Sequence, residues 1–235
     1  MTFDFDKEMM YMKRHLHILR DYNKNKYDFR EQISKIFDID ISQLDKVHTH
    51  GYHYDVFQEF GPDTQTWYHE TFYEYLKSDK GGEMKSMYDI LIKEVILPYL
   101  GLNEALVQKF PSFRIQLPEN VAVAKRHNDH SLGHPYGEVN FTYTITDMNE
   151  TNAILIEKTT GKNDFVSMEM EANNIMCFNG NQNLHYNNVN KTGKTRMSMD
   201  FRVLPMNYIP EQETSSHSTN TKFADGGYYK YFDIS

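Results

Sequence analysis

Residues able to bind a metal ion and a small acid are spaced along one stretch of the chain, 126–202. It contains the run His127-Asn128-Asp129, a later histidine at His185, and the run Arg196-Met197-Ser198. Two imidazoles and one carboxylate can occupy one face of an octahedral Fe(II), which leaves the other face open for a bidentate keto acid and for oxygen. An arginine fork is suited to holding the far carboxylate of such an acid.

A His-x-Asp pair alone is a weak signal, and the chain contains a second one, His53-Tyr54-Asp55. The later residues distinguish the two pairs. Arg196-Met197-Ser198 is the one Arg-x-Ser sequence in the chain, and it begins eleven positions after His185. His127 precedes His185 by 58 residues, which is room for four or five short strands, whereas the stretch after His53 includes helical sequence. We therefore predict a site at His127, Asp129 and His185, and interpret His53 and Asp55 as a coincidence or a substrate-side element.

Two predicted strands near this site have one apolar and one polar face, because side chains alternate along a strand. In 196–203 the polar face carries Arg196, Ser198, Asp200 and Arg202, and in 139–146 it carries Asn140, Thr142, Thr144 and Thr146. In antiparallel sheets such a face more commonly meets solvent. The spacing from His185 to Arg196 favours the alternative, a barrel with a polar interior and an apolar outer face covered by helices.

The first half of the sequence is typical of helices. Apolar residues at helical spacing predict a helix over 5–24, a second from Asp28, and a third over about 83–97 that Pro98 would end. The segment 44–70 is ambiguous. Its histidines His48, His50 and His53 match no closed zinc pattern, so we interpret them as a loop or strand, or as one wall of a substrate pocket.

The second half is typical of short strands separated by turns. Strands are predicted near 112–117, 121–126, 139–146, 152–158, 165–170, 174–178, 185–188 and 196–203. Helices followed by strands predict an α+β fold, with helices packed on a jelly roll or cupin-like barrel. We divide the chain into a mainly helical part (1–109), a barrel (110–205) and a tail (206–235) that docks on the barrel or on a second subunit of a homodimer.

The composition of the chain limits the kinds of partner and the cellular compartment that we expect. The net charge of −8, without a basic cluster beyond Lys125-Arg126, argues against a nucleic-acid surface. No apolar run is long enough to cross a bilayer, and the acidic N-terminus is unlike a targeting peptide. The single cysteine, Cys177, lies in an apolar run and excludes an internal disulfide. We expect a cytoplasmic protein that acts on a small molecule.

The residues quoted above resemble the Fe(II)/2-oxoglutarate-dependent oxygenases, whose barrel is a double-stranded β-helix. The resemblance covers roughly 110–205, and the runs 127–140, 151–153 and 195–202 are similar to the StrG-like, phytanoyl-CoA-hydroxylase-like group. It implies that His127, Asp129 and His185 ligate iron, and that Arg196, helped by Ser198, binds 2-oxoglutarate. Because Asp129 retains the carboxylate ligand, the resemblance implies that O2 is used to hydroxylate an aliphatic C–H bond, or for another oxidation, with release of succinate and CO2.

Several polar residues near the motif are candidates for substrate binding, and together they predict a small polar metabolite such as an amino acid or a sugar-like molecule. They are Arg114, Arg126, His130, His134, Glu138, Asn140 and Arg202. Each could equally form a salt bridge or hydrogen bond within the fold. Glu138 could also hold a metal-ligating histidine by its second nitrogen.

Two other functions remain open. A cupin-type metal-binding isomerase or binding protein would use His130, His134, Glu138 and His185, but it leaves Asp129 and Arg196 unexplained. A non-enzymatic jelly-roll module would bind sugar or peptide through exposed aromatic residues, for which Trp67, Tyr136 and Tyr186 are candidates. Neither alternative requires 2-oxoglutarate.

Overall fold

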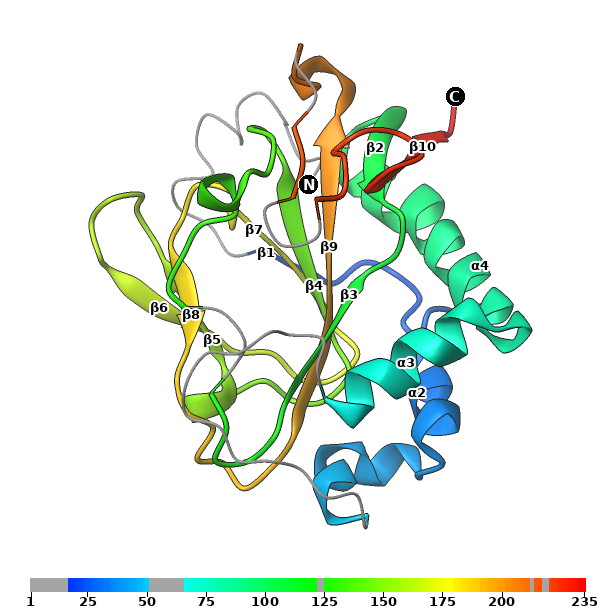
Figure 1. The fold of residues 1–235 in the computed structure, drawn as a ribbon, viewed down its shortest axis with the longest axis vertical. Helices are drawn as coiled ribbons and strands as arrows, with labels where there is room; N and C mark the ends of the chain where they lie inside the picture. The colour runs from blue at the N-terminus through cyan, green and yellow to red at the C-terminus, as the bar shows by residue number, and fades with distance from the viewer. Residues whose placement is uncertain (1–16, 51–65, 122–124, 212–213, 217–219) are drawn as a thin grey trace.

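The computed structural model describes residues 17–50, 66–121, 125–211, 214–216 and 220–235. It shows a mixed α/β fold with two antiparallel sheets, and helices cover one face of the larger sheet (Figure 1). None of the helices in these residues has the length and apolar character needed to cross a membrane. His53 and Asp55 lie outside the described residues.

The helices occupy the first half of the chain, as predicted. They are α2 (Phe29–Phe37), α3 (Trp67–Lys77), α4 (Gly82–Leu91) and α5 (Leu97–Leu100). Two 3-10 helices, η1 (Ile41–Thr49) and η2 (Asp79–Gly81), lie between them. The carboxylate of Asp28 caps α2 by accepting the backbone N–H of Arg30 at 3.0 Å. Helix α3 lies partly in the segment that the sequence left ambiguous. Its first turn is capped by the Thr66 hydroxyl, which accepts the backbone N–H of His69.

The prediction that Pro98 ends the third helix is wrong. Helix α4 continues through a π turn, η3 (Ile92–Ile96), into α5, and the helix ends at Gly101, which has a φ of 67°. Proline lacks an N–H and its ring clashes with the carbonyl four residues earlier in an α-helix. The wider π turn directly before Pro98 allows the chain to pass this clash without leaving the helix.

The prediction of a helix over 5–24 is wrong in the part that can be compared. Residues 1–16 lie outside the described part, and His17–Leu19 form strand β1, which pairs antiparallel with β7 (Ile175–Phe178). The helical spacing of apolar residues was outweighed here by a strand partner about 160 positions away, which local periodicity does not reveal.

The larger sheet has the strand order β1-β7-β4-β9-β2-β10, and β3 also pairs with β9. These strands are β4 (Val139–Thr144), β9 (Arg196–Pro205), β2 (Glu104–Gln108), β10 (Tyr229–Asp233) and β3 (Ser112–Gln116). The smaller sheet has the order β6-β5-β8, with β6 (Phe165–Met168), β5 (Ile154–Glu157) and β8 (His185–Asn187).

Seven of the predicted strands are present with small differences at their ends. The strand predicted over 121–126 is not, since Val121, Lys125 and Arg126 are in no strand and 122–124 are outside the described part. Strands β2 and β10 were not predicted. They pair with each other, Gln108 opposite Tyr229, and so each depends on a partner more than a hundred residues away.

The two faces of the larger sheet differ sharply. On one face Phe113, Phe141 and Phe201 pack against the helices, with Phe113 stacked on Phe72 of α3 at 4.4 Å and Phe141 on Phe201 at 5.1 Å. The opposite face carries the polar row of β9, of which Arg196 is 2% exposed and Ser198 is fully buried. The interpretation in which this row meets solvent is therefore wrong, because the row points into the protein and the apolar face is the one that the helices cover.

Candidate metal centre

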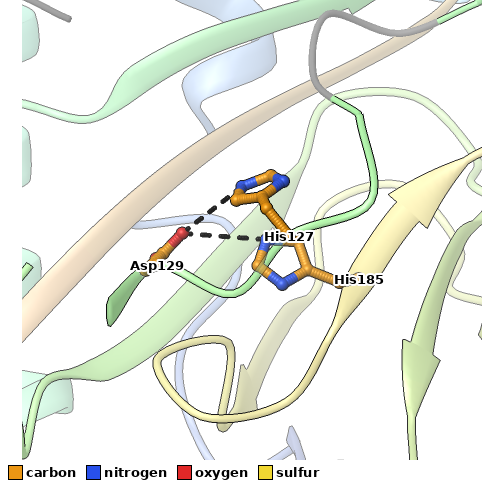
Figure 2. Close-up of side chains that lie close together, drawn as sticks. All are labelled: His127, Asp129 and His185. Atoms are coloured by element: carbon orange, nitrogen blue, oxygen red, sulfur yellow. Dashed lines mark ion pairs between the residues drawn. The ribbon is translucent and has the colours of Figure 1, made fainter. Parts of the chain in front are cut away.

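Three potential metal ligands converge where the segment before β4 of the larger sheet meets β8 of the smaller sheet. His127 and His185 pair across an antiparallel bridge, and the backbone N–H of Asp129 donates to the carbonyl of Gly180 at 3.0 Å. Figure 2 shows the Asp129 carboxylate directed at both imidazoles. Its Oδ1 lies 3.6 Å from Nε2 of His127 and 3.8 Å from Nε2 of His185.

Each imidazole is oriented by a backbone carbonyl. Nδ1 of His127 lies 2.7 Å from the carbonyl of Lys125, and Nδ1 of His185 lies 3.1 Å from that of Asn183. Because a carbonyl can only accept, each Nδ1 carries the proton and each Nε2 keeps its lone pair toward the cluster. One ligand atom from each residue lies within 4.8 Å of the others, so the donor set fits a divalent metal ion.

The protonation states of the residues in this cluster favour binding of a metal ion. Burial lowers the pKa of His185, although Asp129 opposes the shift, so that the imidazole is neutral at neutral pH. Burial would raise the pKa of Asp129, but the Arg202 guanidinium and His127 hold it well below its usual range. Metal ligands must be deprotonated, and all these shifts act in that direction.

The second carboxylate oxygen of Asp129 is already engaged. Oδ2 accepts hydrogen bonds from Nδ2 of Asn140 at 2.6 Å and from Nε of Arg202 at 2.7 Å. Asp129 therefore presents only Oδ1 to the two histidines. Two of the residues considered for substrate binding, Asn140 and Arg202, contact this ligand instead.

Arg196 and Ser198 lie on the interior face of β9 and are buried without complete hydrogen bonding. Within the described residues, Nε of Arg196 and Oγ of Ser198 have no hydrogen-bond partner, and Nη1 of Arg196 contacts only the Met148 sulfur, at 3.9 Å. Burial lowers the pKa of Arg196 to about 10. Asp200 opposes this shift, but Asp200 is ion-paired with Arg114, and Arg196 has no ion pair of its own among the described residues. A buried cation without an ion pair is costly, so this geometry fits a ligand that brings a carboxylate.

The remaining candidates divide between the interior and other surfaces. Nε of Arg114 donates to Asp200 at 3.1 Å on the interior face, and the hydroxyl of Thr142 donates to the same carboxylate at 2.9 Å. The side chains of Arg114 and Asp200 are 29% and 20% exposed. Sequence reasoning placed Asp200 on the polar face of its strand, yet only the register of β3 and β4 with β9 shows what it binds.

Arg126 is not brought to the cluster. Its guanidinium lies over the Phe165 ring, 4.5 Å from the centroid, and bonds to Asn163. Phe165 packs against Tyr186, whose side chain is on the opposite face of β8 from that of His185. His130 is exposed, with Nδ1 3.0 Å from the carbonyl of His134.

His134 and Glu138 belong to a separate contact network. Nδ1 of His134 lies 2.8 Å from Glu138, whose other oxygen accepts the hydroxyl of Tyr229. The potential ligand group that contains this pair also contains Asp129, but neither His130 nor His185. The cupin ligand set is therefore not assembled in the part of the chain that the structure describes.

His48 also has a place in the fold. Its Nδ1 lies 2.7 Å from the hydroxyl of Thr195, directly before Arg196. The contact joins η1 to the start of β9, and the neighbouring Lys194 forms an ion pair with Asp45 at 3.2 Å. This histidine lies at the Arg196 end of the interior face, away from the potential ligand groups found in the described residues.

Comparison with known proteins agrees with this geometry. No family model matches the sequence. The chain is 30% identical over 169 residues to the streptomycin biosynthesis protein StrG of Streptomyces griseus, covering 71% of this chain and 77% of that protein.

Solved structures share the fold at low identity. A nickel complex of the non-haem monooxygenase ThoJ matches with a TM-score of 0.56 and 11% identity, over 96% of this chain and 86% of that one. The α-ketoglutarate-dependent carbocyclase SnoK from nogalamycin biosynthesis matches with a TM-score of 0.53 and 11% identity, over 89% and 85%. The apo form of EctD from S. alaskensis matches with a TM-score of 0.53 and 9% identity, over 91% and 80%.

The fold is therefore that of the non-haem monooxygenase ThoJ and of the α-ketoglutarate-dependent carbocyclase SnoK, and the His127–Asp129–His185 cluster lies within it. By sequence, the chain belongs to the family of the streptomycin biosynthesis protein StrG.

Proposed function

We propose that this protein is an Fe(II)- and 2-oxoglutarate-dependent oxygenase that hydroxylates an aliphatic C–H bond of a small polar metabolite. His127, Asp129 and His185 hold the iron. Arg196, with Ser198, binds the distal carboxylate of 2-oxoglutarate, and O2 is the second cosubstrate. Succinate and CO2 are the coproducts of the keto acid.

The observation that carries this proposal is that two potential binding groups lie in the interior of the protein. Three metal-ligating atoms converge within 4.8 Å of one another, and the face of β9 presents a buried guanidinium whose Nε has no hydrogen-bond partner in the described residues. A metal ion satisfies the first site and a carboxylate satisfies the second. A bidentate keto acid with a distal carboxylate is a ligand that satisfies both.

The chemistry of oxidation comes from the iron and the keto acid when they are bound, and the protein supplies their placement. The carbonyls of Lys125 and Asn183 orient the two imidazoles. Asn140 and Arg202 hold one oxygen of Asp129, which leaves the other for the metal. The methionine-rich cluster between the sheets excludes water from the Arg196 end, through Met148, Met168, Met170 and Met176.

We further propose that the two sheets form a double-stranded β-helix and that the parts have separate roles. Residues 110–205 carry the catalytic barrel, the helices of the mainly helical part (1–109) cover its apolar face, and the tail (206–235) docks on the barrel and braces its metal end. The protein acts in the cytosol, and the buried thiol of Cys177 suits a reducing compartment.

Arg114 and Asp200 support the assignment of a polar substrate. They are the charged pair on the interior face that keeps partial exposure, so they can exchange solvent contacts for contacts with a hydroxyl or amino group. Asn140, Arg202, His134 and Glu138 are assigned to bracing the site, because their polar contacts are with Asp129, with one another or with residues of the C-terminal tail.

The test is an anaerobic titration of the Fe(II)-loaded protein with 2-oxoglutarate, followed by its visible charge-transfer band. A saturable band that His185→Ala abolishes is expected. Screening of small polar metabolites for stimulated succinate release, with mass analysis of products, then separates hydroxylation from ring formation or other oxidation. If iron binds but no band forms, the 2-oxoglutarate assignment is overturned.

A further inference from the structure

The metal ligand Asp129 is connected to the C-terminal tail through an unbroken chain of hydrogen bonds. The connection begins at Arg202, whose Nε holds Oδ2 of Asp129 at 2.7 Å. Nη1 of the same guanidinium donates to the Tyr228 hydroxyl at 3.1 Å and to Oε1 of Gln108 at 3.4 Å. Tyr228 in turn donates its hydroxyl to Gln108 at 2.8 Å.

A second branch runs through Glu138. Its carboxylate is fully buried, lies 4.0 Å from Nε of Arg202, and accepts the hydroxyl of Tyr229. His134 contacts its other oxygen at 2.8 Å. A buried carboxylate beside a buried guanidinium requires partners on every side, because each unmet charge would carry a large desolvation cost.

The fold brings the two tyrosines to this position by one strand pairing. In β10, Tyr229 lies opposite Gln108 of β2, and the carbonyl of Tyr228 accepts the backbone N–H of Lys109. The same tail segment contributes Phe223, whose ring packs 4.5 Å from that of His134 and 5.0 Å from that of Tyr228. Docking of the tail therefore places a hydrogen-bond partner on both Arg202 and Glu138.

The consequence for the metal concerns the number of coordination positions. With Oδ2 of Asp129 held by Asn140 and Arg202, the carboxylate can bind an ion through Oδ1 alone. Two imidazoles and one oxygen then leave three positions of an octahedral ion free, enough for a bidentate acid and one further ligand. A carboxylate released from Arg202 could bind through both oxygens and would remove one of those positions.

We propose that Tyr228 and Tyr229 of the C-terminal tail are positioning residues for the metal site: they fix Arg202 and Glu138, which keep Asp129 a one-oxygen ligand. This inference rests on the proposed iron site. It assigns to the tail a role in metal affinity and in coordination geometry, in addition to packing.

The experiment compares Tyr228→Phe, Tyr229→Phe and the double variant with Tyr231→Phe in the full chain. Tyr231 is a matched control, since it lies on the same strand, is 40% exposed, and bonds to Glu104 away from the site. Affinity for Fe(II) alone is measured anaerobically, and Co(II) spectra report the coordination geometry. Because outer partners of ligands commonly contribute ~10–100-fold to metal affinity, we expect about tenfold weaker binding in Tyr228→Phe and more in the double variant.

The outcomes separate the inference from the iron site itself. Weaker binding and a changed Co(II) spectrum in the Tyr228 and Tyr229 variants, with Tyr231→Phe like wild type, supports it. Unchanged affinity and spectrum in all variants overturns it while leaving the iron site intact. Absence of Fe(II) binding by wild type overturns both. If a variant is less stable, the rise in Tm on adding metal is compared with that of wild type. A smaller rise supports the inference, whereas an equal rise overturns it, because a purely structural role lowers Tm equally with and without metal.

Discussion

His127 and His185 hold each other in place through a reciprocal pair of backbone hydrogen bonds. The N–H of His185 donates to the carbonyl of His127 at 2.8 Å, and the N–H of His127 donates back at 3.2 Å. Their rings lie 4.5 Å apart between centroids. Two ligands separated by 58 residues in sequence are thereby set side by side before any metal binds, which lowers the cost of assembling the site.

Removal of one imidazole tests the ligand set. We expect His185→Ala to weaken Fe(II) binding at least ~100-fold, because the site would lose one of its three protein ligands. Isothermal titration under anaerobic conditions measures the affinity. His130→Ala is the control, because this exposed histidine, which follows Asp129 in the chain, is in no potential ligand group of the described residues. Equal loss in both variants would contradict the assignment.

Arg196→Met should separate stability from ligand binding. The substitution removes a buried charge whose Nε has no partner and puts a thioether beside Met148, so the ligand-free protein should be stabilised by about 1–3 kcal/mol. Affinity for 2-oxoglutarate should fall at least ~30-fold, which corresponds to the lower end for losing one partner of a buried charge pair. Denaturant unfolding and the charge-transfer titration measure the two effects. A destabilised variant would show that the attraction of Asp200 already compensates for the buried charge of Arg196.

Gly180 gives a test of the contact that holds Asp129. A β-carbon at this position would lie 2.8 Å from the Phe178 ring and 2.9 Å from Nδ2 of Asn140. We expect Gly180→Ala to displace Asn140 from Asp129 and to weaken Fe(II) binding by about tenfold. Gly82→Ala, where a β-carbon meets nothing within 4 Å, should leave the affinity unchanged. Wild-type affinity in Gly180→Ala would mean that Asn140 is dispensable.

The stability of the protein should depend on pH through His69. Burial lowers its pKa to about 4, from 6.5. Between these values the unfolded chain takes up a proton that the folded chain does not, so stability falls as pH decreases from about 6.5 to 4, by roughly 3 kcal/mol. Urea unfolding of the metal-free protein across this range measures the slope. His69→Gln should flatten it, and an unchanged slope would assign the dependence to other groups.

The sequence was sufficient to predict those features that depend on residue type and on spacing along the chain. The cluster of His127, Asp129 and His185 was predicted from motif spacing, and the structure brings the three together. The alternation along 196–203 predicted one polar face, since side chains of a strand must alternate. Helix α2 begins after Asp28 because its capping carboxylate is adjacent in sequence.

Predictions were wrong where a distant partner decided the outcome. His17–Leu19 form a strand because β7, about 160 positions away, offers an edge. The helix that passes Pro98 is an exception, because there the deciding feature is a π turn directly before the proline. Arg202 and Asn140 looked like substrate residues, yet strand register places them opposite each other and beside Asp129. The residues that flank a charged side chain in the sequence do not show whether its partner is a bound ligand or another residue.

The sequence by itself determined the chemistry that is available: which side chains can bind metal, which can bind a carboxylate, and which face of each strand they share. These properties follow from residue type and from the fixed periods of helix and strand. Only the tertiary structure decided which oxygen of Asp129 remains free and which buried guanidinium has an Nε without a hydrogen-bond partner among the described residues. It also decided that tyrosines near the C-terminus contact the residue that holds Asp129, about a hundred positions earlier. Those outcomes depend on strand pairing and burial, which no local pattern encodes.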